Sequence, residues 1–315
     1  MLNFVCQESE EEKKEKMNLK FKPEEMIFPT YKPQLNVSEL EKSLSFIKEK
    51  NESDISPEES KQLALFNNQK KMILIFASNK FEGSKLSQFE TYRILQEWMN
   101  KSLEEIQEAL DQEPIQENKR SSPSSRREVL QHYVAFENLH KHLNEELEEE
   151  LIKSTHKLLM QGFLDYDGQN IDEGKYRTEN VSANGFLFLD PKYVEESMTK
   201  LVAKFNENVK DPNIDSCLLA GCLMAEFLTI HPFNDGNGRM SRLLFNYALA
   251  KRGIRTIIPI VDVSANRELY MKALKRYQQG AREKHTERLS ILWLLSANLV
   301  QDFWLEFDSF KISSI

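Results

Sequence analysis

Residues 231–244 of the 315-residue chain, HPFNDGNGRMSRLL, bring together residue types suited to binding a phosphate-bearing ligand. The histidine at its start has an ordinary pKa of about 6.5, so it can accept a proton near neutral pH. Gly236 and Gly238 permit backbone angles closed to other residues and can turn successive N–H groups toward one anion. Arg239 and Arg242 add two permanent positive charges. The segment therefore predicts a phosphate site with a base beside it.

The same segment indicates how its flanking helices must end and begin. His231 precedes Pro232, which disfavours the α conformation, so the apolar helix upstream must end at about residue 230 or 231. Both arginines fall near the first turn of the next predicted helix, where free N–H groups and the helix dipole already favour an anion. A ligand or a carboxylate partner is therefore expected to compensate them. Taken singly, these residues also fit an ordinary loop–helix junction with surface salt bridges.

Most of the remaining chain shows helical periodicity, and its 10 glycines and 10 prolines leave few breaks. Residues 174–191 interrupt this pattern, and Asn184-Gly185 between apolar residues makes them the best candidate for a β-hairpin. We therefore expect an all-α fold class, a helical bundle with one small β-hairpin. The predicted helices cover residues 38–50, 57–83, 87–109, 128–142, 144–160, 191–209, 215–229, 239–252, 266–279 and 286–307.

Three regions are expected along the chain. They are a loose charged arm at residues 1–35, an N-terminal helical region at 36–115, and a main domain at 116–310. A polar stretch rich in Pro and Ser, residues 111–128, is predicted to be an exposed loop where the last two regions meet. The glutamates of 144–160 are predicted to form a solvated helix face, and His156 among them is predicted to be a structural histidine.

Composition and charge limit the classes of function. The chain has 42 Lys plus Arg against 50 Asp plus Glu, and a formal charge of −8 argues against a general nucleic-acid surface. Three scattered cysteines, Cys6, Cys217 and Cys222, are too few for a disulfide framework or a zinc site. The N-terminus does not resemble a signal peptide, and the longest apolar stretch is too short for a bilayer. We therefore expect a cytoplasmic protein without a membrane partner.

The string HPFNDGNGRMSR resembles the signature of the Fic family, HPFx(D/E)GNGRxxR, at every fixed position. A looser likeness extends from about residue 30 to about residue 300. It includes GKYRT, residues 174–178, and RELYMKAL, residues 267–274. The resemblance implies an all-α Fic fold and transfer of a nucleotide monophosphate, usually AMP from ATP, to a Ser, Thr or Tyr hydroxyl of a target protein or of the chain itself.

Carried over to matching positions, the resemblance makes His231 the general base and Asp235 the ligand of Mg²⁺. Gly238 stands where phosphate-transferring Doc-like members have lysine, which indicates a nucleotidyl-transferring protein. Arg242 would hold the γ-phosphate, and Arg239 the β-phosphate side. The Asn237 side chain would join the backbone amides around the phosphates. The nucleotide site implied in this way consists of Gly236, Asn237, Gly238, Arg239, Arg242 and Tyr270.

A second string, SNKFEG at residues 78–83, resembles the inhibitory motif of the family, (S/T)xxxE(G/N). The resemblance implies a helix N-terminal to the main domain, carrying Ser78, Glu82 and Gly83. Its glutamate would pair with Arg242 and keep that arginine from the γ-phosphate. The alternative without an inhibitory role is an ordinary helix C-terminus capped by Gly83. SSRREV, residues 124–129, has the glutamate but lacks the Gly or Asn after it, so it is set aside.

The predicted hairpin corresponds to the target-docking flap of the family. We expect the target backbone to pair with it as an added strand. The expected partners are ATP and an unidentified protein with a hydroxyl side chain, with no nucleic acid, and the sequence leaves a homodimer open. The flap residues are Val181, Ser182, Ala183, Asn184, Gly185 and Phe186.

Two other functions remain open on the sequence. The same residues could remove AMP from a modified protein, with Glu82 positioning the water. A nucleotide-gated regulatory protein with negligible turnover is the other alternative, although such a protein needs neither His231 nor Asp235.

Overall fold

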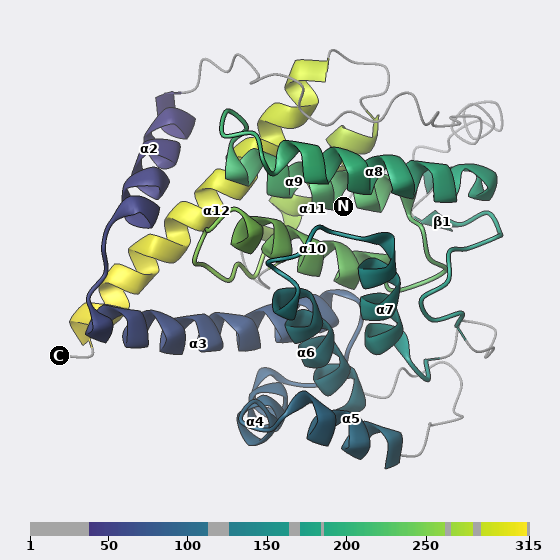
Figure 1. Ribbon diagram of the computed structural model, residues 1–315, viewed down its shortest axis with the longest axis horizontal. Helices are drawn as coiled ribbons and strands as arrows, with labels where there is room; N and C mark the ends of the chain where they lie inside the picture. Colours follow the sequence, from purple (N-terminus) through teal and green to yellow (C-terminus); the bar gives the residue numbers. More distant parts are fainter. Residues whose placement is uncertain are drawn as a thin grey trace, which may run out of the picture.

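The computed structural model describes residues 38–112, 126–163, 171–183, 186–261, 266–279 and 285–313. The all-α class is confirmed, because the strands among these residues are two short segments and the rest of the regular structure is helical (Figure 1). The expected arm at 1–35 and the middle of the expected loop at 111–128 lie outside the described residues. The helical elements are α2 (Ser38–Glu52), α3 (Pro57–Phe81), α4 (Gln88–Trp98), α5 (Leu103–Gln112), α6 (Arg126–Lys141), α7 (Glu149–Met160), the 3₁₀ turn η2 (Pro191–Tyr193), α8 (Val194–Asn208), α9 (Ser216–Ile230), α10 (Asn237–Lys251), α11 (Asn266–Gln279) and α12 (His285–Ser313).

Helix α9 forms the centre of the bundle. Its residues are mostly apolar, and every one from Cys217 to Ile230 is buried, as expected for a helix with neighbours on each side. It packs against α8, α10, α11 and α12 (Figure 1). None of the helices in the described residues combines the length and the hydropathy that a membrane-spanning helix requires.

Both ends of α9 are fixed by the sequence around them. At its start, the Asp215 carboxylate accepts hydrogen bonds from the N–H groups of Cys217 (2.9 Å) and Leu218 (3.0 Å), and from the indole of Trp293 (2.7 Å). At its end, His231 leaves the helical conformation directly before Pro232, as predicted. The central helix therefore delivers the histidine to its C-terminal end.

Helix α3 brings the N-terminal region to the same place. Ser56 and Glu59 form a capping box at its start, with Pro57 at the first position. The helix packs against α4, α6, α10 and α12 (Figure 1). Ser78 and Asn79, near its C-terminal end, are buried polar residues. The start of the SNKFEG segment therefore lies inside the bundle, whereas Glu82 and Gly83 at its end are exposed.

The single helix predicted for residues 87–109 is wrong, because the chain forms α4 and then α5. Ser102 begins the second helix with a capping box of its own. Its hydroxyl accepts the Glu105 N–H at 3.1 Å, and the Glu105 carboxylate accepts the Ser102 N–H at 2.8 Å. The apolar periodicity continues across the break, so the pattern alone hid the new start.

The helix predicted for 144–160 begins later than expected, at Glu149. Asn206 of α8 accepts the Leu147 N–H at 3.0 Å and donates to the Leu147 carbonyl at 2.8 Å. These bonds replace the helical partners of Leu147 and keep the segment before α7 extended. The tertiary contact overrides a strongly helical composition.

The strands β1 (Ser182–Ala183) and β2 (Phe186–Leu187) pair antiparallel, with Ser182 opposite Leu187 and Ala183 opposite Phe186. Asn184 and Gly185 lie outside the described residues. The Phe188 N–H donates to the Val181 carbonyl at 3.1 Å and extends the pairing by one residue. The short pair ends directly before a residue that contacts His231.

Candidate active site

His231 lies where the bundle core meets the following loop. The backbone of His231 is strained. Its φ of 53° is positive, and no other non-glycine residue in the described part of the chain has a positive φ. Such strain in a non-glycine residue persists only where the surroundings impose it, and it is common at functional sites. Its ring stacks on Phe188 with 3.7 Å between ring centroids, and Nδ1 lies 3.4 Å from the Leu228 carbonyl oxygen. This geometry favours the tautomer with the proton on Nδ1 and leaves the Nε2 lone pair for chemistry.

The electrostatic surroundings keep this imidazole neutral. Burial lowers the pKa of His231 to about 4, and the positive charge of Arg177 acts in the same direction. The Leu228 carbonyl and the negative charge of Glu82 act against this shift. The ordinary value of about 6.5 used in the sequence argument is therefore wrong for the folded protein. At neutral pH the imidazole is a proton acceptor.

The loop after His231 is closed by the Asn237 side chain. Its Oδ1 accepts the Phe233 N–H at 3.0 Å, and its Nδ2 donates to the Phe233 carbonyl at 2.8 Å. Both polar atoms of this amide group thus bind the backbone of the loop. The first helical bond of α10 runs from the Met240 N–H to the Gly236 carbonyl at 2.9 Å. The N–H groups of the three residues between them lie at the helix start, where anions are favoured.

Gly236 meets two separate requirements of this loop. Its φ is 76°, and a Cβ there would lie 2.6 Å from Met160 Sδ and 3.1 Å from His156 Nε2. His156 accepts the Gly174 N–H at Nδ1 (2.9 Å), so its Nε2 carries the proton and donates to the Asp235 carbonyl at 2.9 Å. Its ring also stacks on Phe233 at 3.6 Å. The prediction that His156 is a structural histidine agrees with these contacts.

Arg242 is a buried cation, with a side chain 1% exposed. Its Nη2 lies 2.5 Å from Glu82 Oε1, and its Nε donates to Ser78 Oγ at 2.7 Å. Nη2 also approaches the Ser78 carbonyl at 3.3 Å. The predicted contact between Glu82 and Arg242 is therefore present, and Ser78 of the same string binds this arginine as well. Gly83 follows with φ of 100°, a conformation that suits glycine at a helix end.

The Glu82 carboxylate lies directly over the start of α10. A Cβ on Gly238 would collide with Glu82 Oε1, so the carboxylate lies against the backbone where the phosphate is expected. Burial alone would raise the pKa of Glu82, but the charges of Arg242 and Arg239 outweigh it and lower the pKa. The side chain is 33% exposed. Glu82 is thus an ionised group that solvent and ligands can reach.

Arg239 also has a carboxylate partner, but the sequence did not identify the residue that supplies it. Its Nη1 lies 3.5 Å from Oε1 of Glu128 on α6, and both side chains are buried, 6% and 4% exposed. Burial raises the pKa of Glu128, against the opposing charge of Arg239 and a hydrogen bond to Ser84. Glu128 is the glutamate of SSRREV, the string set aside for lacking the residue after it. The pairing depends on the packing of α6 against α10, which the sequence pattern does not show.

The other two predicted ligands, Tyr270 and Asp235, differ in their exposure. Tyr270 of α11 is buried, and its ring centroid lies 5.8 Å from that of Phe81, beside Arg242. Asp235 is exposed, and its Oδ1 accepts the Gly236 N–H at 2.6 Å. The described residues contain no cluster of three or more His, Cys, Asp or Glu side chains that could hold a metal ion. One carboxylate fits Mg²⁺ when phosphate oxygens and water supply its remaining ligands.

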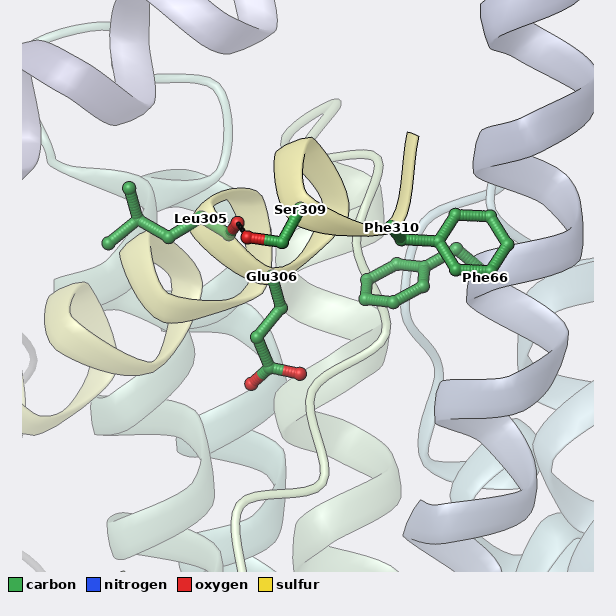
Figure 2. Close-up of a pocket in the computed structure, with 5 residues that line it drawn as sticks. All are labelled: Phe66, Leu305, Glu306, Ser309 and Phe310. Atoms are coloured by element: carbon green, nitrogen blue, oxygen red, sulfur yellow. Dashed lines mark hydrogen bonds between the residues drawn. The ribbon is translucent and has the colours of Figure 1, made fainter. Parts of the chain in front are cut away.

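A separate hollow of about 430 Å³ is lined by residues of α3 and α12 (Figure 2). It contains none of the predicted site residues, and its side chains are mainly apolar. We therefore assign the candidate site to the loop before α10. The hollow is lined by Phe66, Leu305, Glu306, Ser309 and Phe310.

Comparison with known sequences shows that residues 146–249 match the Fic/DOC family. A Fido domain-containing protein of Dictyostelium discoideum is 34% identical over 138 residues, 43% of this chain and 93% of that protein. A probable protein adenylyltransferase of Aquifex aeolicus is 29% identical over 116 residues, 37% of this chain and 34% of the relative. Protein adenylyltransferase fic-1 of Caenorhabditis elegans is 32% identical over 95 residues, 30% of this chain and 18% of the relative. The chain thus spans about a third or less of these two adenylyltransferases.

Solved structures share the fold. A Fic domain-containing signaling protein of Bacteroides thetaiotaomicron superposes with a TM-score of 0.62 at 24% identity, over 88% of this chain and 97% of that one. Fic-1 of C. elegans gives 0.62 at 18% identity, over 86% of this chain and 72% of that one. The helical bundle is therefore a Fic fold.

We predict that Gly238→Ala displaces Glu82 from Arg242. Gly238 is helical, so alanine fits the backbone, but its methyl group would collide with the carboxylate. Hydrogen exchange followed by mass spectrometry should show roughly fivefold to tenfold faster exchange in the last turn of α3, corresponding to about 1–1.4 kcal/mol. In a Glu82→Gly background the same substitution should have no such effect. Equal exchange rates in wild type and Gly238→Ala would contradict the contact.

Proposed function

The chain belongs to the Fic/DOC family, and we propose that it transfers AMP from ATP to a Ser, Thr or Tyr hydroxyl of a protein. The names of its relatives in A. aeolicus and C. elegans support protein adenylyltransfer at the level of the family. The observation that carries the proposal is one arrangement. A neutral, half-buried imidazole ends α9, and two buried arginines lie in the first turns of α10, after the short loop that follows it.

His231 acts as the general base in this proposal. Nε2 takes the proton of the target hydroxyl, and the hydroxyl oxygen attacks the α-phosphorus of ATP. A new P–O bond forms to the target, and the bond between the α-phosphorus and the bridging oxygen breaks. Pyrophosphate leaves with the electron pair of that bond. The low pKa keeps His231 ready to accept the proton at neutral pH.

The residues after His231 hold the phosphates. The N–H groups at the start of α10 face the α- and β-phosphates, and Arg239 and Arg242 neutralise the charge of the departing pyrophosphate. Asp235 would hold Mg²⁺, which supplies positive charge to the phosphate oxygens when it is bound. The adenine side is assigned to the region of Tyr270, next to the end of α3.

Glu82 inhibits this reaction by binding Arg242, the residue that would otherwise hold the γ-phosphate. Arg242 binds the carboxylate and the Ser78 side chain at the same time, so the nucleotide must displace the carboxylate to reach it. The partial exposure of Glu82 supports displacement without unfolding of α3. Autoinhibition is then a competition between a carboxylate and a phosphate for one buried cation.

The paired strands supply the target-docking edge. The target backbone adds to the segment from Val181 to Leu187, which ends one residue before Phe188 and its stacked His231. Docking through backbone hydrogen bonds brings a hydroxyl to the base with little dependence on the other side chains of the target.

A second candidate function is the removal of AMP from a modified protein. Glu82 is an ionised carboxylate whose charge reaches His231, so it is placed to orient a water molecule. Incubating wild type with a protein that already carries AMP, and measuring released AMP, separates this direction from transfer.

We predict that ATP labelled at the α-phosphate, and not at the γ-phosphate, transfers label to protein. Autoradiography of the purified chain and of a lysate measures this directly. His231→Ala should reduce transfer at least about a hundredfold, because a general base contributes roughly that factor or more, while ATP binding is kept. Label arriving from the γ-phosphate would refute nucleotidyl transfer, and near-normal transfer by His231→Ala would exclude this residue as the base.

Glu82→Gly should raise transfer by roughly tenfold or more, because removing the carboxylate frees Arg242 for the nucleotide. The gain corresponds to about 1.4 kcal/mol or more released from the inhibited state. The measurement is the initial rate with α-labelled ATP on helical, folded samples.

The double variant Glu82→Gly with Arg242→Ala is the control, and it should lose the gain because the freed arginine is absent. Equal or slower transfer by Glu82→Gly alone would contradict autoinhibition and favour the AMP-removing role of the carboxylate.

A further inference from the structure

Arg177, in the segment between α7 and the paired strands, binds the strained turn at His231. Its Nε donates to the His231 carbonyl at 2.7 Å, and its Nη2 approaches the Ile230 carbonyl at 3.3 Å. Its own backbone N–H donates to the Pro232 carbonyl at 2.8 Å. One residue therefore contacts three successive carbonyl groups around the base.

The same guanidinium also binds both sides of the strand pair. Its Nη1 donates to the Glu179 carbonyl before β1 at 2.7 Å, and its Nη2 donates to the Leu189 carbonyl after β2. Between Leu189 and β2 lies Phe188, which stacks on the imidazole of His231. The contacts of Arg177 thus join the docking edge and the base through their backbones.

The chemistry of this position requires an arginine. The residue is 3% exposed, and burial lowers the pKa of its guanidinium to about 10, so it remains charged at neutral pH. A buried cation is unfavourable unless its donors are satisfied, and here they are satisfied by backbone carbonyls. A lysine has one ammonium group and cannot reach carbonyls on both sides with fixed geometry.

We propose that Arg177 is a positioning residue that holds the His231 imidazole and the docking edge as one unit. The base and the target backbone are thereby placed relative to each other before the target binds. The inference rests on the proposed function, since it assigns the strand pair to target docking. It adds a residue that touches neither nucleotide nor target and acts through the backbone of the base.

The test uses the full chain with Arg177→Lys and Arg177→Met. Arg252 provides a matched control, because it also binds carbonyls, those of Val209 (2.7 Å) and Ile214 (2.8 Å), at the far end of α10. Arg252→Met should lower thermal stability without changing the site. Circular dichroism and ATP binding verify that each variant is folded.

The first readout is the pKa of His231 by NMR titration of labelled histidines, with the signal assigned by its loss in His231→Ala. Arg177 and Glu82 are the charged groups that act on this ring. Arg177→Met should therefore raise the pKa of His231 from about 4 toward its ordinary value, whereas Arg252→Met should leave it in place. This readout does not require activity, so it remains informative if adenylyl transfer itself is not observed.

The second readout is steady-state transfer to a protein target in a Glu82→Gly background. Both Arg177 variants should lower kcat/KM for the target at least about tenfold, while KM for ATP changes less than about twofold. Unchanged target kinetics and an unchanged His231 pKa in a folded Arg177→Met sample would overturn the proposal. Equal losses for target and ATP, or a matching effect in Arg252→Met, would likewise overturn it in favour of a general role in stability.

Discussion

The ion pair between Glu82 of α3 and Arg242 of α10 is the contact on which the resting site depends. Arg242 is almost fully buried, and a buried charge without a partner destabilises a protein by several kcal/mol. The end of α3 must therefore stay against α10 unless another anion replaces its carboxylate. A phosphate is the replacement that the start of a helix already favours. Arg239 is subject to the same constraint and is held by Glu128.

The residues around these two arginines lie at the ends of helices. His231 ends α9 in a strained conformation, Gly236 begins α10 with a positive φ, and Glu82 ends α3. Helix ends have free N–H and carbonyl groups, so the strain is fixed by side chains that bind backbone, such as Asn237 and Arg177. The candidate catalytic groups thus lie at polar helix ends, in front of the buried apolar helix α9.

Much of this arrangement could be read from the sequence, for reasons tied to particular residues. Pro232 determined the end of α9, and the two arginines required an anion, so a carboxylate partner was foreseeable. Other features could not be predicted from the sequence. Asn206 binds the backbone of Leu147 and delays the start of α7. Ser102 starts a new helix within an apolar pattern that is continuous. Glu128 and Arg177 were missed because their roles depend on what the fold places opposite them. The low pKa of His231 is likewise a property of burial.

The central claim is that Glu82 binds Arg242 and keeps it from the γ-phosphate. Calorimetry of nucleotide binding tests this claim most directly. Wild type and Glu82→Gly would be titrated with Mg²⁺ and either AMP or an ATP analogue that has a methylene bridge between its α- and β-phosphorus atoms and cannot transfer AMP. The account predicts that Glu82→Gly lowers Kd for the triphosphate by about tenfold or more and changes Kd for AMP by less than about twofold, because AMP has no γ-phosphate. Equal changes for both nucleotides, or no change for either, would contradict it.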